Sequence, residues 1–275
     1  MYKIQQVEKI SLKTLLKPNA ISLPLYAIFL AEAFFYHKQL YLGLGLHIIN
    51  LISIVALAIL AKYLKFKKME IDRENLDYLQ IIMLIPLLRI INTSIPVFFP
   101  LTIYWFPFIY APMFIPIYLA AKNQGYTKDQ IGLESNLRRN VLYTGVGLLL
   151  GALLGYIEYF LLHPGGLVED LSLSNFLKIT LIMFLFIGLV EELIFRSLLQ
   201  TKLEQLFNPT YGLIIASLIF AAMHSGYSLP LEIIFAASAG LIIGYLFQRT
   251  RNLYFITTIH GTINVFLFAI IPLTI

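Results

Sequence analysis

The sequence contains no cysteine, a single tryptophan and few charged residues, with Asp, Glu, Lys and Arg together making up only 13% of the chain. The absence of cysteine excludes disulfides, thiolate nucleophiles and cysteine-ligated metals, and it leaves the compartment open. Soluble domains usually carry about a quarter charged residues. Because 59% of the residues are hydrophobic and the mean hydropathy is +0.80, the composition predicts a multi-pass integral protein of the cell membrane.

Apolar segments occur along nearly the whole chain, separated by polar loops or prolines. A helix of about 20 residues crosses about 30 Å of hydrocarbon. Pro96 and Pro100 divide the longest uncharged stretch, because proline removes a backbone donor and clashes with the preceding turn. The sequence therefore predicts an all-α bundle of about nine transmembrane helices. They are expected at 20–36, 40–62, 78–95, 98–121, 141–162, 175–201, 210–224, 230–248 and 253–274.

Lysine and arginine concentrate in alternate loops. The net charge of +5 could indicate nucleic-acid binding, but in a chain this apolar we expect basic residues to set the orientation in the lipid bilayer, with no nucleic-acid partner. The positive-inside rule then places the N-terminus in the cytoplasm and, after nine spans, the C-terminus outside. The loops rich in basic residues are the N-terminal tail, 65–73, 122–139, the loop at Lys202 and 249–251.

Two short segments, one at the end of the first predicted helix and one in the loop after the fourth, predict features other than a membrane span. Ala31-Glu32-Ala33 resembles a signal-peptide cleavage site, but Pro24 interrupts the short apolar region before it, which favours a retained first helix. Thr127 and Gln130 have the spacing of a capping box. They predict a short amphipathic helix on the cytoplasmic surface that includes Ile131, Leu133 and Leu137.

Charged residues inside apolar segments are costly, by about 2.5–3.5 kcal/mol each at a helix centre, so each one suggests a function or a partner. Glu32, Glu158 and Glu232 lie near predicted helix ends, where side chains reach headgroup water. Arg89 is expected to pair with a carboxylate in the bundle or to lie near the outer interface. His47 is expected to be a hydrogen-bonded packing residue.

The stretch EELIFR, which begins at Glu191, is harder to explain by packing. Glu192 and Arg196 are four residues apart, which places them on one helical face and allows an ion pair. Glu191 points about 100° away around the helix, so the same arginine does not readily neutralise it. A carboxylate without a cation in a medium of low dielectric is suited to act as a general base near neutral pH.

Further polar residues in later helices are candidates to face Glu191. His224 closes the segment FAAMH, and counting residues from the intervening turn returns it to about the depth of Glu192. His260 and Asn264, four apart in HGTIN, share one helical face. Residue counting places His260 less well at that depth. Together these residues predict a polar cavity formed by three helices.

The ordered set EELIFR, FAAMH and HGTIN resembles the CAAX protease and bacteriocin-processing (CPBP, or Abi) family of intramembrane proteases, which includes the Rce1-type prenyl endopeptidases. The resemblance implies an endopeptidase in which Glu191 activates a water molecule. It implies that His224 holds or polarises that water. His260 and Asn264 would donate hydrogen bonds to the oxyanion formed at the scissile carbonyl.

Glu192 and Arg196 would fix the helix and orient Glu191 on this interpretation. A metal is an open alternative, since zinc binds His and carboxylate ligands, and Glu191, His224 and His260 could supply three. The HExxH helix of zincins is missing, and a buried Glu-His pair can tune a base unaided. The prediction therefore favours a glutamate-activated water and no cofactor, with zinc as the alternative.

Other functions fit the sequence less well. The four aspartates all fall in predicted loops, no GxSxG serine motif occurs and cysteine is absent, so aspartyl, serine and cysteine protease chemistry is disfavoured. The expected substrate is a peptide or prenylated protein that enters from the bilayer and reaches a cavity on the cytoplasmic side. A non-proteolytic membrane protein of the same fold, acting in bacteriocin immunity or peptide binding, is the alternative. A proton-coupled transporter lacks the expected inverted repeat.

The chain is accordingly divided into three parts. Residues 1–19 are predicted to be a cytoplasmic tail, and residues 20–125 to form the first four transmembrane helices. Residues 126–275 are predicted to form the CPBP-like catalytic core.

Overall fold

The computed structural model describes residues 12–66, 73–98, 103–133 and 137–275, and within these ranges every regular element is a helix. The all-α prediction is confirmed. Seven described helical segments are long and apolar enough to cross a membrane, which identifies a multi-pass integral membrane protein. They are Leu40–Leu60, Asn75–Ser94, Arg138–Leu162, Leu173–Leu206, Pro209–Tyr227, Pro230–Thr250 and Leu253–Leu273.

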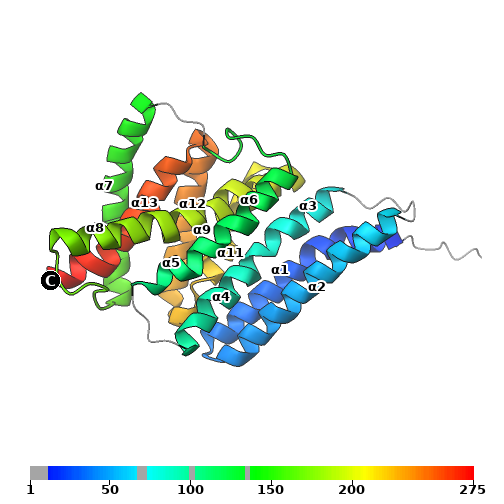
Figure 1. Cartoon of the computed structure of the whole chain (residues 1–275), viewed down its shortest axis with the longest axis horizontal. Helices are drawn as coiled ribbons and strands as arrows, with labels where there is room; N and C mark the ends of the chain where they lie inside the picture. The colour runs from blue at the N-terminus through cyan, green and yellow to red at the C-terminus, as the bar shows by residue number, and fades with distance from the viewer. Residues whose placement is uncertain (1–11, 67–72, 99–102, 134–136) are drawn as a thin grey trace, which may run out of the picture.

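The first part of the chain forms helices that occupy one side of the molecule, from its edge toward its middle (Figure 1). The first two pack side by side along that edge, and the fourth packs against the second. These elements are α1 (Leu12–Tyr36), α2 (Leu40–Phe66), α3 (Arg73–Ile82), α4 (Leu84–Phe98), α5 (Trp105–Tyr110), the 3-10 turn η1 (Ala111–Met113) and α6 (Phe114–Asn123).

The second part carries the sequence motifs. Its central element is one uninterrupted helix, Leu173–Leu206, made of alternating α and π segments. The elements are α7 (Leu137–Leu162), α8 (Leu173–Leu181), η2 (π, Ile182–Gly188), α9 (Leu189–Glu192), η3 (π, Leu193–Gln200), α10 (Thr201–Leu206), α11 (Pro209–Ala222), η4 (3-10, Ser225–Tyr227), α12 (Pro230–Thr250), α13 (Leu253–Val265), η5 (π, Phe266–Ile270) and η6 (3-10, Ile271–Leu273).

All nine predicted apolar segments contain helix, but two of them fall short of a full span among the described residues. The apolar part of α1, Ser22–Tyr36, is too short to count as a full membrane span. The helix itself begins at Leu12, whereas the sequence predicted a start near residue 20. The predicted segment 98–121 is divided among α5, η1 and α6. The helix α4 continues through Pro96 and is described as far as Phe98, and the next helix, α5, begins at Trp105. Pro100 lies outside the described residues.

The capping box at Thr127 and Gln130 forms, but the helix predicted after it is wrong. The Thr127 N–H donates to Gln130 Oε1 at 2.9 Å and the Gln130 N–H donates to Thr127 Oγ1 at 3.3 Å. The segment is a turn that ends at Gly132, whose φ of +77° leaves the helical region. Its backbone is bound to the bundle instead, because Ser197 Oγ donates to the Ile131 carbonyl at 2.8 Å.

The glutamates expected to reach headgroup water are buried inside the bundle. Glu32, Glu158 and Glu232 are 2%, 5% and 0% exposed, because neighbouring helices cover the helix ends that carry them. The interpretation of these three as solvated residues is therefore wrong. Arg89 pairs with Glu32, which confirms the prediction that it pairs with a carboxylate in the bundle. His47 Nε2 lies 2.9 Å from Glu32 Oε1, which confirms that His47 is a hydrogen-bonded packing residue.

A row of glycines on α7 brings α13 into close contact. Gly147, Gly151 and Gly155 recur every four residues on one face of α7, the small-residue pattern that lets membrane helices approach closely. A Cβ at Gly151 would stand 2.6 Å from the Ile259 carbonyl oxygen, and one at Gly155 would stand 2.7 Å from the Ile263 oxygen. The backbone contact therefore fixes α13, which carries His260 and Asn264, against α7.

Candidate active site

The two adjacent glutamates lie on the only short α segment between two π segments of the long central helix. Glu191 and Glu192 close α9, with η2 before it and η3 after it. A π segment adds a residue to the turn and changes the direction of the side chains that follow, and such segments occur often at functional sites. The backbone here therefore departs from the regular α-helix assumed when counting residues.

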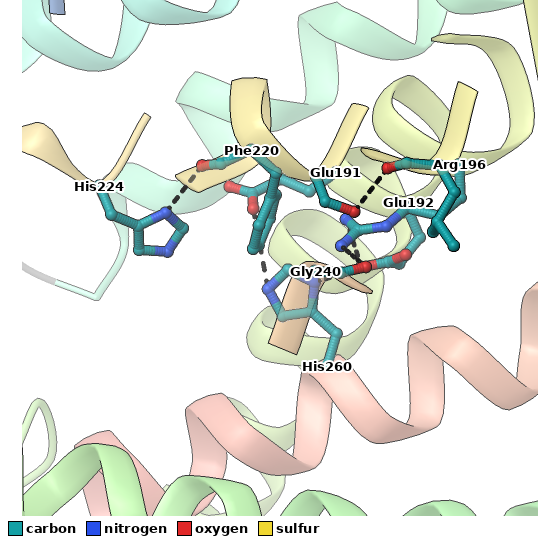
Figure 2. A network of polar contacts seen from close by, with 9 residues as sticks. Glu191, Glu192, Arg196, Phe220, His224, Gly240 and His260 are labelled. Atoms are coloured by element: carbon teal, nitrogen blue, oxygen red, sulfur yellow. Dashed lines mark hydrogen bonds and ion pairs between the residues drawn. The ribbon is translucent and has the colours of Figure 1, made fainter. Parts of the chain in front are cut away.

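Glu192 and Arg196 form the predicted ion pair. Arg196 Nη1 lies 3.2 Å from Glu192 Oε1, and the two side chains are 1% and 0% exposed. The guanidinium carbon of Arg196 stands 4.3 Å from the centre of the Phe220 ring, so the cation also packs on an aromatic face (Figure 2). Arg196 Nη2 points toward the Gly240 carbonyl at 3.5 Å. This pair ties the central helix to α11 and α12.

His260 lies between the two glutamates. Its Nδ1 is 2.7 Å from Glu192 Oε1, and its Nε2 is 3.7 Å from Glu191 Oε2. An ionised carboxylate accepts hydrogen bonds only, so with Glu192 ionised Nδ1 carries the hydrogen that joins it to Glu192. This contact fixes the ring and directs Nε2 toward Glu191. The sequence left the depth of His260 in the membrane uncertain. In the structure, α13 places His260 level with α9.

Glu191 has a different hydrogen-bond partner from Glu192. The hydroxyl of Tyr110, at the end of α5, donates a hydrogen bond to Glu191 Oε1 at 2.6 Å. The side chain of Glu191 is 15% exposed, whereas Glu192 is fully buried. Glu191 is thus the glutamate of the pair that is open to a cavity.

His224 is held at the end of α11 by its own helix. Its Nδ1 lies 3.0 Å from the Phe220 carbonyl oxygen, so Nδ1–H donates and Nε2 is left for another partner. Phe220 separates the two histidines, with its ring centre 4.9 Å from that of His224 and 5.8 Å from that of His260 (Figure 2). This ring sets the spacing between the two imidazoles.

A cavity of about 560 Å³ joins these groups, large enough for a short peptide segment. Glu191, His224, His260 and Asn264 all line it, although they come from three separate helices. Glu192 and Arg196, the two residues expected to support the site, lie beside it rather than in its wall. The remaining lining residues are Leu88, Arg89, Asn92, Phe106, Tyr110, Glu158, Leu167, Ile187, Phe195, Met223, Gly226, Tyr227, Leu267 and Phe268.

Several residues in this wall have no signal in the sequence. Tyr110 belongs to an uncharged aromatic stretch, and only its distance to Glu191 distinguishes it from its neighbours. Arg89 and Asn92 on α4 and Glu158 on α7 also face the cavity. The helices before residue 126 therefore supply part of the cavity wall, beside the predicted catalytic core.

The zinc alternative does not fit the side chains as they are arranged. In the described part of the chain, no three His, Cys, Asp or Glu side chains lie close enough together to hold a metal ion. Catalytic zinc takes three protein ligands at about 2.0–2.2 Å from His or carboxylate atoms. Glu191, His224 and His260, with Phe220 between the two imidazoles, do not form such a set.

Comparison with known proteins matches the part of the chain that carries the sequence motifs. Residues 173–266 match the family described as type II CAAX prenyl endopeptidase Rce1-like, and this stretch includes all the predicted catalytic residues. The chain is 30% identical over 114 residues to the uncharacterized protein YpbD of Bacillus subtilis (strain 168). That match covers 41% of this chain and 56% of the relative, so the chain spans little more than half of it. No solved structure matches the chain significantly.

Proposed function

The chain carries an Rce1-like CAAX prenyl endopeptidase domain, and from this premise we propose that it is an intramembrane endopeptidase. It hydrolyses a peptide bond near the end of a prenylated or membrane-anchored polypeptide, using a water molecule activated by glutamate. One observation supports the proposal most directly. Glu191, His224, His260 and Asn264 are far apart in the sequence and line the same cavity.

Glu191 is the general base in this proposal. The carboxylate takes a proton from a water molecule held between it and His224 Nε2, and the resulting hydroxide attacks the scissile carbonyl carbon. Glu191 suits this role because it borders the cavity, whereas Glu192 is buried and engaged by Arg196. The Tyr110 hydroxyl holds one oxygen of Glu191 and leaves the other for the water.

His260 and Asn264 stabilise the charge that develops on the carbonyl oxygen. With both ring nitrogens protonated, His260 donates from Nδ1 to Glu192 and from Nε2 to the oxyanion. Asn264, one turn further along the helix, donates from its amide nitrogen. When the tetrahedral intermediate collapses, the carbon–nitrogen bond breaks and the proton held by Glu191 passes to the leaving amine.

The wider membrane arrangement is part of the same proposal. The N-terminus is cytoplasmic, and the chain crosses the membrane nine times if α1 and the α5–α6 segment are counted with the seven long spans. We assign residues 1–19 to the cytoplasmic side, where the N-terminal part of α1 begins, residues 20–125 to the first four spans and residues 126–275 to the catalytic core. The matched stretch 173–266 lies inside this core.

Peptide cleavage by protein purified in detergent tests the activity. Wild type and Glu191→Ala are compared on a prenylated CAAX peptide, its unprenylated counterpart and a bacteriocin-leader peptide. Cleavage by wild type alone supports the protease, and the preferred peptide identifies the substrate class. Equal cleavage by Glu191→Ala refutes the assigned base. A folded wild type that cuts none of the three favours the immunity or peptide-binding alternative.

A further inference from the structure

The cavity lies toward one end of the helical bundle. Glu158 is four residues, or about 6 Å, from the end of α7, and Asn92 is six residues, or about 9 Å, from the end of α4. Leu167 lies in the connection after α7, and Gly226 and Tyr227 lie in the connection after α11. These parts of the wall all belong to the end of the bundle formed by connections 163–172 and 223–229.

The rim and the floor of the cavity differ in exposure. Gly226 and Tyr227 are exposed, so the rim meets solvent at the end where they lie. Phe195 and Ile187 are 1% and 7% exposed and form the inner wall. Arg196, which follows Phe195, is sealed against Phe220 and Glu192. The open side of the cavity is therefore the end with the 163–172 connection.

The opposite end of the bundle is held together by polar contacts between its own connections. Lys202 Nζ lies 3.4 Å from Asp77 Oδ2, and Gln124 Nε2 donates to the Asp77 carbonyl at 2.9 Å. Arg251 pairs with Glu204 in the same region. These contacts show that α3 begins, and α6, α10 and α12 end, at one common end of the bundle. No cavity-lining residue comes from this end.

Basic residues are gathered at that opposite end. Apart from Arg89, which is buried and paired with Glu32, the described basic residues of the cavity end are Lys38 and Lys178, and the acidic Glu169 and Asp170 lie there too. Cytoplasmic loops of membrane proteins carry the excess of Lys and Arg. Among the described residues, the basic residues at the opposite end include Lys62, Lys65, Arg73, Lys122, Lys128, Arg138, Arg139, Lys202, Arg249 and Arg251.

We infer that the cavity opens on the extracytoplasmic face of the membrane, and that it admits an exported, membrane-anchored peptide presented on that face. A cavity on the cytoplasmic side and a cytoplasmic N-terminus, both expected from the sequence, are incompatible in this fold, and the basic residues decide in favour of the N-terminus. Cleavage of that peptide depends on the proposed function. The face of the membrane on which the cavity opens does not depend on it.

Single cysteines test the sidedness cleanly, because the native chain has none. Gly226→Cys reports the cavity rim, and nothing lies within 4 Å of the Cβ that it adds. Ser174→Cys, exposed near the start of α8, marks the cavity end, and Gln205→Cys, exposed in α10, marks the basic end. Each variant is treated with a membrane-impermeant sulfonated maleimide in intact cells, in inside-out vesicles and in detergent.

The expected result is labelling of Gly226→Cys and Ser174→Cys in intact cells, and of Gln205→Cys only in inside-out vesicles or detergent. Labelling of Gly226→Cys from the same side as Gln205→Cys overturns the inference. So does a Gly226→Cys that reacts in detergent but not in intact cells. The readout needs no catalysis, so a protein that cuts no peptide still answers this question, and a correctly sided cavity without cleavage counts against the proposed function alone.

Discussion

The hydroxyl of Tyr110 donates a hydrogen bond to Glu191 at 2.6 Å across 81 residues of sequence. Tyr110 belongs to the first part of the chain and Glu191 to the stretch that matches the Rce1-like family. This contact makes the helices before residue 126 part of the environment of the proposed base. Their influence on catalysis can be measured separately from their influence on folding.

Tyr110→Phe removes the hydroxyl and keeps the ring. Because the hydroxyl only orients the base, we expect kcat to fall about tenfold, less than the roughly 10²-fold that a misplaced catalytic group can cost, with KM little changed. Steady-state cleavage of the preferred peptide measures both constants. Tyr104→Phe, the same change at an exposed tyrosine in the same region, is the control. An unchanged kcat in Tyr110→Phe would contradict the positioning role.

Glu191→Gln keeps the shape of the side chain and removes its ability to take a proton. We expect cleavage to fall by a factor of about 10² to 10⁴, the usual contribution of a general base, with the thermal unfolding midpoint close to that of wild type. Glu169→Gln, the same change in an exposed loop, should leave cleavage intact. Residual activity in Glu191→Gln within a factor of three of wild type would exclude Glu191 as the base.

Arg196→Met should destabilise the protein through Glu192. Both groups are buried, and removing one member of a buried ion pair leaves the other charge without compensation, at a cost of about 3–5 kcal/mol. The double variant Arg196→Met with Glu192→Gln removes both charges and should regain most of that stability. Thermal unfolding in detergent measures each protein. If the single and double variants unfold at the same temperature, the pair is not what stabilises this region.

The double variant should remain inactive even if it regains stability. Glu192 is also the carboxylate that holds His260 Nδ1 at 2.7 Å, and glutamine carries no charge to support an imidazolium. Cleavage by the double variant at the wild-type rate would therefore argue against a charged His260 in the oxyanion step. Stability thus reports the contact of Glu192 with Arg196, and catalysis reports the contact of Glu192 with His260.

Gly151→Val should separate α7 from α13. The added side chain would meet the Ile259 carbonyl oxygen, which cannot move without shifting α13. Overpacking of this kind costs about 1–3 kcal/mol, and we expect a lower unfolding temperature together with reduced cleavage, since α13 carries His260. Gly145→Val is the matched control, because nothing lies within 4 Å of a Cβ there. Equal behaviour of the two variants would exclude the close approach as the cause.

Local features of the chain were predictable from the sequence alone. The apolar segments gave the all-α membrane class, and the four-residue spacing gave the Glu192–Arg196 pair, since neighbours on one helix depend only on helical geometry. The family resemblance, carried by three short motifs in order, is confirmed for residues 173–266.

Contacts between helices were decided by the tertiary structure. Residue counting left the depth of His260 uncertain and gave Tyr110 no role, and it placed Glu158 and Glu232 in headgroup water although they are buried. Sequence spacing fixes a side chain only relative to its own helix. Where two helices meet depends on how closely their backbones pack, which the glycine row on α7 sets for α13. For the same reason the sequence determined which loops are basic, and only the fold decided which end of the bundle holds the cavity.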